Sequence, residues 1–167
     1  MKKFLVISFL FVLLAPSCQK NYTNYMEVDE IEHIIITNTD SEFGYCDVSQ
    51  YHLTSDFNPL SGLIEAKICV SNDSSNFNEY GIFKFSTPDD AQKAVSQIKN
   101  YLKKTKKDFE SGIIYDIEEY PKFENADTIL YGNYVIYTIL KKDEKEKIFS
   151  EIKNYSKKGI QMYPFIY

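Results

Sequence analysis

Two stretches of the chain repeat the same order of hydrophobic and polar positions. Residues 79–104 and 133–158 each begin with apolar and polar residues in alternation, continue with an acidic pair and end with apolar residues at helical spacing. At a constant offset of 54, eleven of the twenty-six aligned positions are identical. Alternation with a period of two is typical of a half-buried strand, and a spacing of three to four is typical of an amphipathic helix. The pattern therefore predicts two similar strand–helix units.

The helix of the first unit has a recognisable start. Thr87 can serve as the N-cap, Pro88 fills the first turn, where no N–H is needed, and Asp89 and Asp90 meet the positive end of the helix dipole. The expected apolar stripe consists of Ala91, Ala94, Val95, Ile98, Tyr101, Leu102 and Phe109. The second helix repeats this arrangement with Asp143, Glu144, Ile148, Phe149, Ile152 and Tyr155.

A further strand is expected before each unit. Residues 63–70 would pair with residues 79–86 across a polar loop, and residues 128–131 would pair with residues 134–140 through a tight turn at Gly132-Asn133. The order ββα–ββα predicts an α+β fold, a four-stranded antiparallel sheet with two helices on one face.

The rest of the chain adds less to this architecture. Val28, Ile31, Ile34 and Ile35 predict an additional N-terminal helix. Residues 38–60 are polar and rich in turn residues and give no clear element. Residues 110–127 are expected to form a connector with one helical turn.

The first eighteen residues are typical of an export signal. Lys2 and Lys3 precede an apolar run over residues 4–15 that only Ser8 interrupts. A helix that crosses a bilayer core needs about twenty residues, and this run has twelve. It suits the hydrophobic region of a secretory signal peptide.

Cys18 follows the small residues at the end of this run, Ala15-Pro16-Ser17. A Cys at this place resembles the lipobox of bacterial lipoproteins, and the resemblance implies that Cys18 is acylated and becomes the mature N-terminus. Ala15-Pro16-Ser17 also fits ordinary small-x-small cleavage, which would give a secreted protein.

These features predict three parts of the chain. Residues 1–17 are expected to be a lipoprotein signal peptide, residues 18–26 a polar tether and residues 27–167 a single α+β globular domain. The expected location is extracytoplasmic, with the protein anchored to the cell membrane by lipidated Cys18. Secretion is the alternative.

The charged residues limit the possible partners, and the cysteines allow one disulfide. The chain has 24 acidic residues against 19 basic ones, and every basic residue is Lys, so bidentate Arg clamps are excluded and we expect no nucleic-acid partner. Beyond Cys18, Cys46 and Cys69 could form one disulfide, or Cys69 could be a buried free thiol in its strand. The sequence leaves both possibilities open.

Four local features stand out between residues 64 and 155. They are the strand at residues 79–85, the long Lys-rich helix that ends near Phe109, the Glu124-Asn125-Ala126 step and the Gly132-Asn133-Tyr134-Val135 segment. With these features the chain resembles an uncharacterised family of small, Lys-rich lipoproteins of low-GC bacteria, a domain of unknown function. The resemblance implies a lipid anchor and a compact extracytoplasmic domain. It brings no known activity, so it transfers no catalytic residues.

Candidate chemistry is sparse. His52 has Asp47 before it and Asp56 after it, which could belong to a hydrolase, but no Gly-x-Ser-x-Gly elbow accompanies it. Helix capping explains the acidic pairs Asp89-Asp90 and Asp143-Glu144 at the starts of the two predicted helices. Residues 72–76 form an oxygen-rich loop that could hold a cation loosely, although a solvated hairpin tip explains it more simply. We therefore predict no catalytic residue, no metal and no cofactor.

The alternation in the two repeated strands separates two faces of the predicted sheet. Phe83, Phe85, Tyr137 and Ile139 should face the helices, and Tyr80, Ile82, Lys84, Tyr134, Ile136 and Thr138 should face away. Either residues 28–60 fold across this second face as another core layer, or a partner contacts it. We expect partial cover by the helix at residues 28–37, which leaves Tyr80, Lys84 and Tyr134 accessible as a contact set.

Two functional classes follow. The first is a non-enzymatic binding or interaction module of the cell envelope, with an envelope protein or a cell-wall glycan as its partner. The alternative is a small extracytoplasmic hydrolase that uses His52 with nearby Asp residues. A hydrolase requires His52 within hydrogen-bond reach of an acid in a concave pocket.

Overall fold

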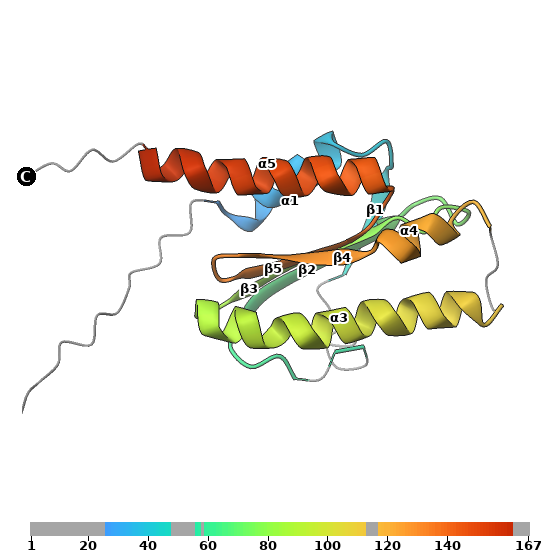
Figure 1. Ribbon diagram of the computed structural model, residues 1–167, viewed down its shortest axis with the longest axis horizontal. Coiled ribbons are helices and arrows are strands. Elements are labelled where there is room, and N and C mark those ends of the chain that lie inside the picture. Colours follow the sequence, from blue (N-terminus) through green and yellow to red (C-terminus); the bar gives the residue numbers. More distant parts are fainter. Residues whose placement is uncertain (1–25, 48–55, 58, 113–116, 162–167) are drawn as a thin grey trace, which may run out of the picture.

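A five-stranded antiparallel sheet forms the centre of the protein. The structure is a computed structural model, and it describes residues 26–47, 56–57, 59–112 and 117–161 (Figure 1). The strands are β1 (Phe43–Asp47), β2 (Leu63–Ser71), β3 (Glu79–Phe85), β4 (Asp127–Tyr131) and β5 (Tyr134–Ile139). Their order across the sheet is β1-β2-β3-β5-β4, and each neighbouring pair is antiparallel.

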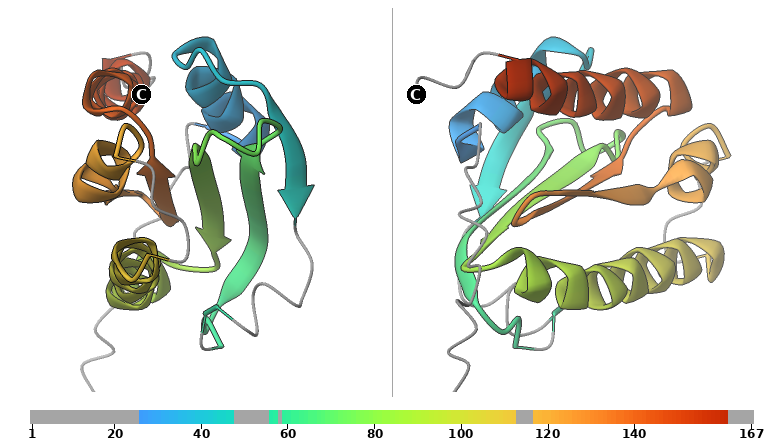
Figure 2. Two further views of the ribbon diagram at one scale, coloured as in Figure 1. Left: turned by 90° about the vertical axis from the view of Figure 1, so that its right-hand side faces the viewer. Right: turned by 60° about the vertical axis from the view of Figure 1, so that its left-hand side comes forward.

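Helices cover both faces of this sheet. They are α1 (Val28–Thr37), α3 (Pro88–Glu110), α4 (Tyr120–Asn125) and α5 (Lys142–Gln161). Figures 1 and 2 show α1 and α5 on one face and α3 on the other. Each face has its own hydrophobic core: Ile31 and Ile148 pack with Ile82 in the first, and Ala94 and Phe109 pack with Phe83 in the second.

The predicted α+β class with an antiparallel sheet is confirmed, but two details are wrong. The sheet has five strands instead of four, because β1 forms within the stretch that gave no clear element. The two long helices lie on opposite faces instead of one. Leu140, just after β5, is buried in the core beneath α5, whereas its counterpart in the first unit, Ser86, is exposed. The burial of Leu140 directs α5 onto the face opposite α3.

The internal repeat is visible in the sheet itself. Both repeated segments form a strand followed by a helix, as predicted. The two strands are adjacent and antiparallel, and Ile82 lies directly opposite Ile136, its counterpart at the offset of 54. Each central strand is also paired with its own preceding strand, β2 with β3 and β4 with β5.

Local sequence signals explain where the elements begin and turn. The Thr87 hydroxyl accepts the Asp90 backbone N–H at 3.1 Å, as expected for the N-cap of α3. Before α5, the Glu144 carboxylate accepts the Lys141 N–H at 3.1 Å. The expected turn between β4 and β5 places Gly132 at a positive φ of 60°. In the described part of the chain, no helix combines the length and the apolar character that crossing a membrane requires.

Candidate functional site

The tyrosines predicted as a contact set are buried. Tyr80 and Tyr134 are both 0% exposed, because α1 and α5 together cover this face of the sheet. Lys84 is partly buried, and its ammonium forms an ion pair with Glu27 at 2.7 Å. The expectation that this set is accessible is therefore wrong, and these residues belong to the structural core and its edge.

Polar anchors hold these buried side chains in place. The Tyr80 hydroxyl donates to Glu32 on α1 at 2.7 Å, and the Tyr134 hydroxyl donates to the Met26 carbonyl oxygen at 3.0 Å. Burial, with the Glu32 carboxylate beside the ring, raises the pKa of Tyr80 well above its ordinary value. The hydrogen bond to Glu27 raises the pKa of Lys84. These contacts join α1 to the sheet and explain why the face is closed.

A pocket lies on the other face, between the β2–β3 hairpin and the C-terminal half of α3. Its volume is about 580 Å³, which is in the range of pockets that hold small molecules. The hairpin contributes the residues of its loop and Glu79 at the start of β3, α3 contributes one face from Tyr101 to Phe109, and α4 contributes Phe123.

Glu79 is one of the carboxylates that line this pocket. Its Oε1 accepts the hydroxyls of Tyr101 at 2.7 Å and Tyr137 at 2.5 Å. Burial is the largest cause that raises the pKa of both tyrosines, and the neighbouring Glu79 charge adds to it. The two hydrogen bonds fix the position of the carboxylate.

Aromatic rings form one wall of the pocket. Phe109 stacks on Phe123 with a centroid distance of 4.3 Å, and Phe77 packs edge-on to Phe109 at 5.8 Å. Phe109 and Phe123 are buried, whereas Phe77 and Tyr101 are half-buried. The half-buried rings give the pocket an apolar surface close to Glu79.

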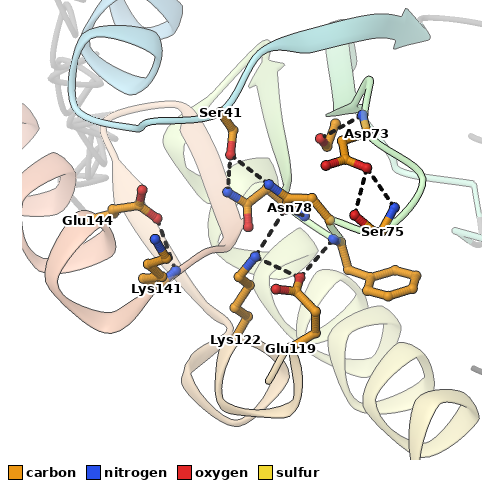
Figure 3. A network of polar contacts seen from close by, with 11 residues as sticks. Ser41, Asp73, Ser75, Asn78, Glu119, Lys122, Lys141 and Glu144 are labelled. Atoms are coloured by element: carbon orange, nitrogen blue, oxygen red, sulfur yellow. Dashed lines mark hydrogen bonds and ion pairs between the residues drawn. The ribbon is translucent and has the colours of Figure 1, made fainter. Parts of the chain in front are cut away.

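A buried lysine fixes the hairpin that frames the pocket. The Lys122 side chain on α4 is 5% exposed, and its ammonium binds Glu119 at 2.6 Å and the Asn76 side-chain oxygen at 3.0 Å. Glu119 also accepts the Phe77 backbone N–H at 2.9 Å. Figure 3 shows this network between α4 and the hairpin loop. The cation bound by the oxygen-rich loop is thus the ammonium of Lys122.

The remaining polar groups of this loop stabilise its shape. Asp73 accepts the backbone N–H of Ser75 at 2.9 Å and the Ser75 hydroxyl at 2.7 Å, and these bonds hold the pKa of Asp73 below its ordinary value. Asn78 is 2% exposed and donates to the Ser41 hydroxyl (Figure 3). The loop is therefore pre-shaped before any ligand arrives.

Cys69 is buried in β2 and is disulfide-bonded. Of the two possibilities that the sequence leaves open for this residue, the buried free thiol is therefore wrong. The strand register places Cys46 of β1 directly opposite Cys69.

Several predicted site residues fall outside the described ranges. Cys18, the expected lipidation site, and His52, the expected base of the hydrolase alternative, are among them. Asp56, one of the acids named with His52, is described and lies at the rim of the pocket, 3.8 Å from the Lys104 ammonium. Within residues 26–47, 56–57, 59–112 and 117–161, no cluster of three or more His, Cys, Asp or Glu could hold a metal ion.

The pocket was not predicted from the sequence, although its parts carried signals. The sequence places Tyr101 and Phe109 on the apolar stripe of the first helix and predicts a polar loop between residues 63–70 and 79–86. Both assignments hold, but a hairpin loop and the far end of a helix meet only through the tertiary fold.

Comparison with known proteins gives a partial match. Residues 59–140 match the family described as Domain of unknown function (DUF4358), so the chain contains a domain of this family over that range. The matched range extends from just before β2 to Leu140 and includes most of the residues that line the pocket. No curated protein and no solved structure matched the chain.

Proposed function

We propose that the protein is a membrane-anchored extracytoplasmic lipoprotein whose domain is a non-enzymatic binding module of the cell envelope. In this proposal residues 1–17 are the signal peptide and acylated Cys18 is the anchor. The pocket between the β2–β3 hairpin and α3 takes a group of the partner, an envelope protein or a cell-wall glycan.

The observation that carries the binding role is the pocket with the Glu79 carboxylate in its lining. The carboxylate accepts two tyrosine hydroxyls, which hold it in place as a hydrogen-bond acceptor. General acid–base catalysis is most efficient with a group whose pKa lies near the working pH, and the two tyrosines are shifted away from that range. Positioned hydrogen-bonding groups beside aromatic rings favour binding.

The disulfide at Cys69 supports the location. Disulfides persist in oxidising compartments outside the cytoplasm and are rare inside it. The charged and apolar N-terminal segment that ends at Cys18 supports the same location independently.

The anchor is tested by metabolic palmitate labelling of the wild type and of Cys18→Ser in intact cells. The expected result is label on the wild type alone, with the variant released from the membrane fraction. Unlabelled wild type in the medium would replace the anchor with simple secretion.

The binding role is tested by crosslinking and affinity capture from intact cells. Wild type should capture an envelope component that Glu79→Gln captures less efficiently, whereas Glu65→Gln, an exposed acid of β2 away from the pocket, should behave as the wild type. Equal capture by all three proteins would contradict a role for the pocket.

A further inference from the structure

Carboxylates outnumber ammonium groups among the described residues that line the pocket. These residues contribute Tyr101, one ammonium and four carboxylates, and the charged ones are Asp56, Asp73, Glu79, Asp108 and Lys104. Lys104 lies 3.8 Å from Asp56. Asp73 is held in its ionised form by the two hydrogen bonds from Ser75. A pocket with this excess of negative charge attracts cations and repels anions.

The aromatic residues of the pocket favour an organic cation over an inorganic one. An inorganic ion prefers a shell of oxygen ligands, and no cluster of three or more His, Cys, Asp or Glu among the described residues could hold a metal. Phe77 and Tyr101 contribute half-buried rings to the same pocket lining as the carboxylates. Ring faces attract an organic ammonium group through their quadrupole, and they also pack against its alkyl chain.

We propose that the pocket binds a small organic amine in its ammonium form, with the charge directed to Glu79 and Asp108 and the alkyl chain against Phe77 and Tyr101. This inference rests on the proposed binding function and names the class of its ligand. The volume of about 580 Å³ suits a molecule of small-metabolite size. The bonds from Tyr101 and Tyr137 hold the Glu79 carboxylate in place before binding, which reduces the ordering needed when the ligand enters.

The test compares three probes with the same five-carbon chain on the full chain purified in mild detergent. Cadaverine is the cation, 1,5-pentanediol the neutral analogue and glutarate the anion. Isothermal titration calorimetry should show cadaverine binding at least tenfold more tightly than either of the others. Its affinity should fall as the salt concentration rises from 20 to 200 mM, because added ions screen the attraction.

Two acidic positions separate the contribution of charge from an effect on folding. Glu79→Gln should weaken cadaverine binding about tenfold, and Asp108→Asn, at an exposed position, should weaken it about threefold through the lost Coulomb attraction. Glu65→Gln makes the same change of charge outside the pocket and should leave the affinity unchanged. If Glu79→Gln does not fold, the affinity of Asp108→Asn for cadaverine tests whether the pocket carboxylates attract the cation.

Two outcomes would overturn the assignment. Cadaverine binding that is absent up to 10 mM, or no tighter than that of pentanediol, would exclude the amine class. Unchanged affinity in Asp108→Asn at low salt would place any bound cation elsewhere. Tight binding of the neutral or anionic probe would retain the binding function of the pocket but contradict an amine as its ligand. The palmitate labelling at Cys18 tests the anchor and does not depend on any of these outcomes.

Discussion

At the scale of single residues, Lys122 is the clearest example of a charge placed inside the protein. Its ammonium is removed from water and relies on Glu119 and Asn76 for compensation. A buried ion pair contributes little net stability when both partners are present, but losing one partner leaves a costly charge. The buried ammonium instead holds the β2–β3 hairpin in position beside the pocket, through its contacts with Asn76 and Glu119.

Lys122→Met should therefore destabilise the protein by about 3 kcal/mol, since it leaves the largely buried Glu119 carboxylate without its ammonium. Urea unfolding of both proteins measures the difference in the free energy of unfolding. Lys103→Met removes the same charge from an exposed position of α3 and should change it by less than about 0.5 kcal/mol.

A double-mutant cycle with Glu119→Gln completes this measurement. The pair should show a coupling energy of at least about 1 kcal/mol if the two side chains compensate each other. Additive effects of the two substitutions would show that the ion pair contributes little.

At the scale of elements, the strand–helix units were predictable because their hydrophobic periods are regular. Thr87-Pro88 and Gly132-Asn133 mark the start of α3 and the last turn of the sheet correctly. β1 was not predictable: it is a strand of five residues, and it includes Gly44, whose missing side chain leaves room for that of Asn72. Its pairing with β2 depends on residues far along the chain.

The choice of face for each helix depended on even less sequence. Leu140 and Ser86 occupy the same place in the repeat, and they differ in polarity and in burial. The candidate site shows the same limit, because the partner of Asn76 in its network is Lys122, 46 residues away. Periodicity reports local structure, whereas these contacts arise from packing.

The pairing of β3 with β5 contains a position that tolerates no side chain. A Cβ on Gly81 would lie 2.1 Å from Cε1 of Tyr137, the residue opposite it in the sheet. The Tyr137 ring cannot move away freely because it is buried and bonded to Glu79. Gly81→Ala should therefore cost about 3 kcal/mol of stability.

Thermal or urea unfolding measures this cost, and the double variant Gly81→Ala with Tyr137→Leu provides the control. Removing the ring creates space for the new methyl group, so the double variant should be more stable than the sum of the two single changes predicts. A single Gly81→Ala substitution that changes stability by less than about 0.5 kcal/mol would show that the ring adapts.

At the scale of the whole molecule, the disulfide at Cys69 connects the fold to its environment. Cys46 is opposite Cys69 in the register, so we expect these two residues to be joined. In the folded protein neither thiol should react with iodoacetamide until a reductant is added, as intact mass measurement would show. Reduction should lower the free energy of unfolding by roughly 3 kcal/mol, because it releases a loop in the unfolded chain.

Cys46→Ser provides the matched comparison. It should lose the same stability as the reduced wild type, and its Cys69 should remain slow to react because that residue is buried in β2. Full labelling of both cysteines without reductant would exclude the bond.

The placement of helices on both faces has a consequence for the matched segment taken by itself. Residues 59–140 include four strands with α3 and α4, but α1 and α5 lie outside them. Within this segment, helices cover only one face of the sheet. The other face carries Tyr80, Ile82, Tyr134 and Ile136, which are covered by α1 and α5 from outside the segment. A bare apolar surface of this kind promotes aggregation. In this chain α1 and α5 cover that side, and Phe57, which also lies outside residues 59–140, completes the core on the pocket side.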